Sequence, residues 1–151
     1  MARSTQLAFS LLASASLIGT AAWAGHVREG GWTFTTTLEG EVEIPVGDLD
    51  GTGTFTMVVN PGQKRVCYDF INIANIDAPT AAHIHIGAAG TAGPPIIPFP
   101  TPPLGSSSAC ANATSRQLAQ IIAKPERFYV NVHNATFPLG AIRGQFSRPA
   151  H

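Results

Sequence analysis

Short β-forming runs separated by turn residues are the feature that most constrains the fold of this chain. The clearest case is "GTGTFTMVVNPGQKRVCYDFINI", residues 51–73, in which two runs rich in Thr, Val and Phe flank Asn60-Pro61-Gly62-Gln63. Proline at the second position and glycine at the third are typical of a type II turn. The pattern therefore predicts an antiparallel hairpin that pairs residues 52–59 with residues 65–73.

The same pattern continues along the chain and contains one helix-like interruption. Further strands are predicted within residues 32–44 (one or two strands), 82–87, 126–134 and 140–146, the last two joined by a turn at Pro138-Leu139. A short helix is expected over 115–123, where Thr114 or Ser115 can cap the start and Pro125 ends it. This order predicts an all-β fold, an antiparallel sandwich or Greek-key barrel with one short helix.

Two segments are expected to lie outside the central sheet. Six of the ten residues from 94 to 103 are proline, and because proline cannot donate a ladder hydrogen bond, this stretch suits an edge or a loop. The serines at 106–108 are most simply a loop.

The N-terminus has the features of a secretory signal peptide. Arg3 precedes an apolar run from about Leu7 to Ile18, and Ala22-Trp23-Ala24 fits the small-x-small cleavage pattern. Cleavage there leaves residues 25–151 as a single domain in the periplasm or outside the cell.

No second apolar stretch is long enough to span a membrane. No Lys/Arg cluster exceeds Lys64-Arg65, which argues against nucleic acid as a partner.

The chain has two cysteines, Cys67 and Cys110. In an exported protein, an oxidising environment favours their pairing. A cysteine-ligated metal would require a nearby partner at motif spacing, and the sequence has none. A Cys67–Cys110 disulfide is therefore expected.

Three histidines form a candidate metal site. In "AAHIHIGAAG", residues 81–90, the alternation of a strand places His83 and His85 on one face. In "FYVNVHNA", residues 128–135, His133 shares a face with Tyr129 and Asn131. If the two strands pack together, the three imidazoles suit copper or, less well, zinc. The alternatives are a packed or solvent-facing histidine network with no metal.

The motifs that contain these histidines resemble those of the CHRD domain, first described in chordin. The matching segments are His-Ile-His-Ile-Gly at 83–87, Tyr-Val-Asn-Val-His at 129–133 and Gly-Ala-Ile-Arg-Gly at 140–144. The cysteine pair also fits that family. The histidine segments are more distantly similar to the copper-ligand segments of copper/zinc superoxide dismutases, which implies a dismutase-like barrel. The bridging histidine and the zinc ligands of those enzymes have no counterpart here.

Three functions remain open from the sequence. The first is an exported protein that binds a copper ion through His83, His85 and His133, for storage, transfer or redox chemistry. Tyr129, Asn131 and Arg143 are then candidates for contacts around the ligands, although Arg143 could instead hold a loop carbonyl. The second is a metal-free module that binds another protein, as chordin's use of the domain implies. The third, a copper-only dismutase-like enzyme, would need a further ligand, for which His26 and His151 are candidates.

Overall fold

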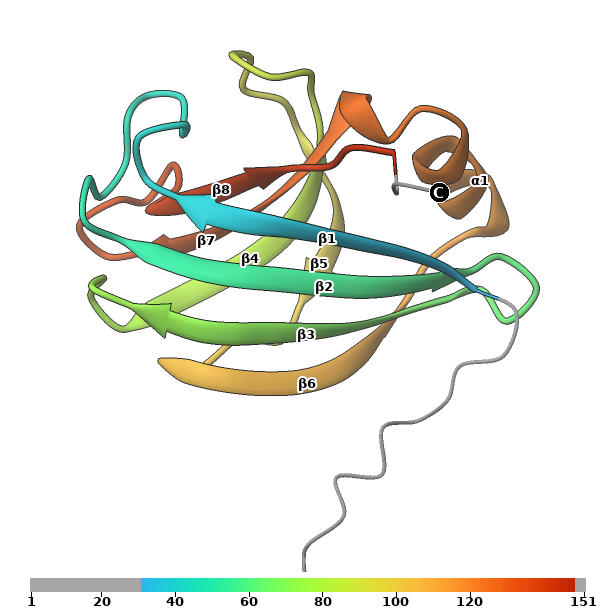
Figure 1. Ribbon diagram of the computed structural model, residues 1–151, viewed down its shortest axis with the longest axis horizontal. Coiled ribbons are helices and arrows are strands. Elements are labelled where there is room, and N and C mark those ends of the chain that lie inside the picture. The colour runs from blue at the N-terminus through green and yellow to red at the C-terminus, as the bar shows by residue number, and fades with distance from the viewer. Residues whose placement is uncertain (1–30, 149–151) are drawn as a thin grey trace, which may run out of the picture.

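A computed structural model describes residues 31–148, which form eight strands, one α helix and one short 3₁₀ helix (Figure 1). The elements are β1 (Trp32–Glu39), β2 (Thr52–Asn60), β3 (Arg65–Ala74), β4 (Pro79–Ile86), β5 (Pro95–Phe99), β6 (Gly105–Asn112), α1 (Ser115–Ala123), the 3₁₀ turn Pro125–Arg127, β7 (Phe128–Asn134) and β8 (Ile142–Gln145). The signal peptide predicted over residues 1–24 lies outside the described residues.

All eight strands belong to one antiparallel sheet in the order β5-β4-β7-β8-β1-β2-β3-β6. The sheet curls so that its two edge strands, β5 and β6, come into contact and the barrel nearly closes (Figure 1). The predicted all-β barrel with one short helix is confirmed. The proline-rich segment is an edge strand, β5, as its shortage of backbone donors requires.

The predicted hairpin is present as β2 and β3, with Val59 opposite Val66 and Asn60 opposite Arg65. The predicted type II turn is wrong. Lys64, with φ 52°, adopts the left-handed conformation, and Gly62 does not. The Asn60 side-chain oxygen accepts the Gln63 backbone N–H at 3.0 Å, so a side chain closes the turn.

The barrel interior is apolar and rich in aromatic rings. Alternate residues of every long strand point inward, and Phe55 lies within 6.0 Å, centroid to centroid, of four other rings. These four are Tyr68, Phe70, Phe99 and Phe146. Leu118 and Ile121 of α1 add to the same core. A capping box between Thr114 and Gln117 begins this helix, and its predicted bounds are confirmed.

Two segments differ from the sequence expectation. Residues 42–44 are not in a strand. The chain leaves the sheet after β1 and folds into a compact loop, in which the Gly40 carbonyl accepts the backbone N–H groups of Glu43 and Gly47. The serine-rich segment is not a loop but the start of β6, paired with β3. There Cys67 lies directly opposite Cys110, and the predicted disulfide joins them.

None of the helices within residues 31–148 is long and apolar enough to cross a membrane.

Candidate metal centre

The three candidate histidines lie on the outer face of two neighbouring strands. β4 and β7 pair antiparallel, so that His83 is opposite Asn131 and His133 is opposite Ala81. On β4, Ile84 points into the core and is fully buried, and strand alternation places the histidines on the opposite face. Every residue of β7 is buried, so the outer face is largely covered on this strand.

The structure brings the three imidazoles together. One ring nitrogen from each of His83, His85 and His133 lies within 4.8 Å of the others. His83 Nδ1 is 3.1 Å from His133 Nε2. His85 and His133 are buried, with 7% and 9% of their surface exposed, whereas His83 is only partly buried. Three nitrogens at these separations require only small side-chain shifts to ligate one ion at about 2.0–2.1 Å.

Backbone carbonyls fix the tautomers of two of the rings. His85 Nδ1 lies 2.8 Å from the Gly93 carbonyl oxygen, and His133 Nδ1 lies 3.1 Å from that of Pro138. A carbonyl can only accept, so each Nδ1 carries the proton and each Nε2 presents a lone pair. His85 Nε2 is buried and has no hydrogen-bond partner. Outer hydrogen bonds of this kind orient the histidine ligands of metal sites.

The surroundings keep the imidazoles neutral. Burial lowers the pKa of His133 from 6.5 to about 4, and the nearby His83 contributes to the shift. Burial also lowers the pKa of His83 and of His85, although for His85 the Gly93 carbonyl and the neighbouring Asn131 side chain act in the opposite direction. Neutral rings are the form that binds a metal.

Tyr129 and Arg143 form a stack against the cluster. The His85 and Tyr129 rings lie 4.8 Å apart with an angle of 16° between their planes, and the Arg143 guanidinium lies 3.5 Å from the Tyr129 centroid. Arg143 also donates to the carbonyl oxygens of Thr91 and Ala88 at 2.9 and 3.1 Å. It therefore ties the 87–94 loop, which holds His85, to β8.

One further buried group, Glu43, was not predicted from the sequence. It comes from the loop after β1 and is 1% exposed. Its Oε2 accepts from Asn131 Nδ2 at 3.2 Å, and its Oε1 lies 3.8 Å from Arg143 Nη1. The one sequence feature that marks Glu43 is its position between two aliphatic residues, Val42 and Ile44. In the structure both of these side chains are more exposed than Glu43 itself.

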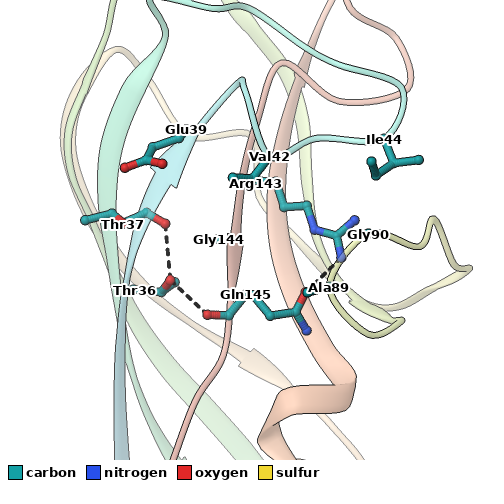
Figure 2. A pocket seen from close by; sticks show the side chains of 10 residues that line it. All are labelled: Thr36, Thr37, Glu39, Val42, Ile44, Ala89, Gly90, Arg143, Gly144 and Gln145. Atoms are coloured by element: carbon teal, nitrogen blue, oxygen red, sulfur yellow. Dashed lines mark hydrogen bonds between the residues drawn. The ribbon is translucent and has the colours of Figure 1, made fainter.

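A groove of about 430 Å³ lies beside this network, between the loop after β1 and the 87–94 loop (Figure 2). Val42 and Ile44 line one side, Ala89 and Gly90 another, and Arg143 reaches into it. None of the three histidines lines the groove, so it is separate from the metal-ligand cluster.

The donor set fits a metal ion that prefers nitrogen ligands. Among residues 31–148, the lone pair of His85 Nε2 has no proton donor, and that of His133 Nε2 faces only His83. Imidazole ligands suit copper, zinc and nickel, whereas magnesium and calcium require oxygen ligands. His26 and His151, which the sequence offered as a fourth ligand, lie outside the described residues.

Comparison with known proteins agrees with the motifs. Residues 34–146 match the CHRD domain family, and this range contains every strand except the first two residues of β1. No curated protein and no solved structure matches the chain. The match spans most of the chain and includes all three histidines and both cysteines, and the chain therefore belongs to the CHRD domain family.

Proposed function

We propose that this protein is an exported copper-binding protein whose ligands are His83, His85 and His133, the last two binding through Nε2. The supporting observation is His85 Nε2, which is buried and has no hydrogen-bond partner among the described residues. Because His85 Nδ1 donates its proton to the Gly93 carbonyl, Nε2 carries a free lone pair. A buried polar atom without a partner is costly and rare in a folded protein. A cation at the cluster would satisfy it.

The choice of copper follows from the ligand types. All three side chains are imidazoles, with no thiolate and no carboxylate in the cluster. Among divalent first-row metals, Cu²⁺ binds most tightly to a given nitrogen site. Three protein ligands also leave a coordination position open, which suits an ion that is transferred or that undergoes redox chemistry.

Export is part of the proposal. The N-terminal 24 residues have the composition of a signal peptide. The Cys67–Cys110 disulfide fits an oxidising compartment. Mass spectrometry of the protein recovered from the periplasm or medium should give an N-terminus at Gly25.

The decisive test is titration of the disulfide-intact protein with Cu(II) and Zn(II), followed by electron paramagnetic resonance of the copper form. We expect one tight equivalent of copper with hyperfine structure from about three imidazole nitrogens, and weaker zinc binding. His85→Ala should remove the tight equivalent while the fold, monitored by circular dichroism, is kept. Binding no tighter than micromolar would instead favour a metal-free interaction module, in which the His83–His133 hydrogen bond is purely structural.

A further inference from the structure

Glu43 lies outside the histidine cluster, yet it contacts a residue that faces the cluster. Its loop turns back over β7 and β8, and the carboxylate is buried there between Asn131 and Arg143. Burial raises the pKa of Glu43, while the Ile44 backbone N–H, Asn131 and Arg143 act to lower it. A buried carboxylate is costly unless it is paired and hydrogen-bonded, and here two hydrogen-bond donors, Ile44 N–H and Asn131 Nδ2, and the Arg143 cation lie around it.

The carboxylate decides which way the Asn131 amide points. Asn131 can present either its NH₂ group or its oxygen to a neighbour. A carboxylate held beside a buried arginine is an acceptor, so the Asn131 Nδ2 must face Glu43, as the 3.2 Å contact shows. Asn131 Oδ1 is left buried and without a partner.

The strand register places the Asn131 side chain beside the histidines. Asn131 of β7 lies between His83 of β4 and Arg143 of β8, in one row across the sheet. Its amide nitrogen is directed to the Glu43–Arg143 pair, and the Asn131 side chain also acts on His85. Two buried atoms in this region, Asn131 Oδ1 and His85 Nε2, are therefore acceptors with no donor.

We propose that Glu43 is a positioning residue of the metal centre, which holds the Asn131 amide so that its oxygen, rather than its NH₂ group, faces the histidines. Asn131 Oδ1 thereby adds an oxygen to a site otherwise made of nitrogens. The reverse orientation would aim two N–H donors at the cluster and oppose a cation. The role of Asn131 toward a metal rests on the proposed function, whereas the orientation of the amide does not.

Gly140 is adapted to the same arrangement. It has φ +144°, and a Cβ built on it would lie only 2.1 Å from Glu43 Oε2. A side chain at this position would displace the carboxylate from Asn131. The backbone conformation and the contact with Glu43 therefore both favour glycine at position 140, where the 135–141 loop passes over Glu43.

The first experiment concerns the metal-free protein. Nuclear magnetic resonance of the Asn131 side-chain amide should show its protons close to Glu43 and Gly140, and not close to the His85 ring. Glu43→Gln should shift these amide resonances, whereas Glu41→Gln, an exposed change in the same loop, should leave them in place. Amide protons next to His85 in the wild type, or resonances unmoved by Glu43→Gln, would overturn the orientation.

The second experiment measures copper affinity. Glu43→Gln should weaken binding about 10- to 100-fold, as loss of an outer hydrogen-bond partner typically does, and Glu41→Gln should not. Asn131→Leu leaves the Glu43–Arg143 pair in place and should weaken binding to a similar extent, which covers the case in which Glu43→Gln does not fold. Wild-type affinity in both variants would refute the positioning role. A wild-type protein that binds no metal would refute the proposed function, and the amide resonances would still decide the orientation.

Discussion

Tyr129 stacks on His85 and also holds the loop that fixes His85. The two rings are nearly parallel, 4.8 Å apart. The Tyr129 hydroxyl accepts the Gly93 backbone N–H at 3.1 Å and lies 3.3 Å from the Gly93 carbonyl oxygen, to which His85 Nδ1 donates. One side chain thus supports both the ring and its hydrogen-bond partner.

Separating these two roles gives a first prediction. Tyr129→Phe keeps the ring and removes the hydroxyl, which accepts from the Gly93 N–H and donates to the Gly93 carbonyl, so it should lower the free energy of unfolding by about 1–3 kcal/mol, the usual contribution of two hydrogen bonds. Tyr129→Leu also removes the stack and the contact with Arg143, and should cost about 2–4 kcal/mol. Urea unfolding of the metal-free proteins measures both values. Equal losses in the two variants would show that the stack contributes nothing.

A second prediction concerns stabilisation by metal. A ligand that binds only the folded state stabilises it by about 2.7 kcal/mol at a free concentration 100 times its Kd. Copper should therefore raise the melting temperature of the wild type. It should leave that of His85→Ala unchanged, because the variant lacks the buried Nε2 lone pair. The comparison is made by calorimetry at one copper concentration, and an equal rise in both proteins would place the ion elsewhere.

The sequence predicted those parts of the fold that depend on local pattern. The β2–β3 hairpin, the helix capped at Thr114 or Ser115 and the placement of the proline-rich segment at an edge or in a loop follow from turn, cap and backbone-donor chemistry that acts within a few residues, although the turn type was predicted wrongly. The sequence also predicted that His83 and His85 share a face of their strand and that His133 shares a face with Tyr129 and Asn131, because side-chain alternation along a strand is a local property.

The remaining features depend on contacts between distant segments. β6 contains "GSSSACAN", with no β-branched or aromatic residue, and it becomes a strand through pairing with β3 and through the disulfide. Glu43 is adjacent to Asn131 only after the loop following β1 folds back over β7, a separation of 88 residues. The composition of β6 does not indicate a strand, and a carboxylate between two aliphatic residues does not indicate which distant residue Glu43 contacts.

A third prediction follows from the lowered pKa of His133. The unfolded chain takes up this proton near pH 6.5, whereas the folded protein takes it up only near pH 4. The contribution of His133 to the free energy of unfolding of the metal-free protein should therefore be constant above pH 6.5, fall as the pH drops from 6.5 to 4, and be constant again below pH 4. The free energy of unfolding should fall by an amount on the order of 1–3 kcal/mol over this range, because solvent screening reduces the full effect of the shift. Urea unfolding in the presence of a chelator should show this slope, and His133→Asn should reduce it but not abolish it, because the pKa values of His83 and His85 are also lowered. An unchanged slope in the variant would assign the proton uptake to other groups.

The last prediction separates the stability of the barrel from the chemistry of the site. The Cys67–Cys110 disulfide closes a separation of 43 residues between β3 and β6. Chain entropy then gives a contribution of about 4 kcal/mol to stability. The Cys67→Ala, Cys110→Ala double variant should lose roughly that free energy in urea unfolding. Its copper affinity should stay within a factor of about two, because the histidines are on β4 and β7, and β5 separates β4 from β6 where the barrel nearly closes. A large loss of copper affinity in a variant that remains folded would show that the pairing of β3 with β6 affects the geometry of the metal centre.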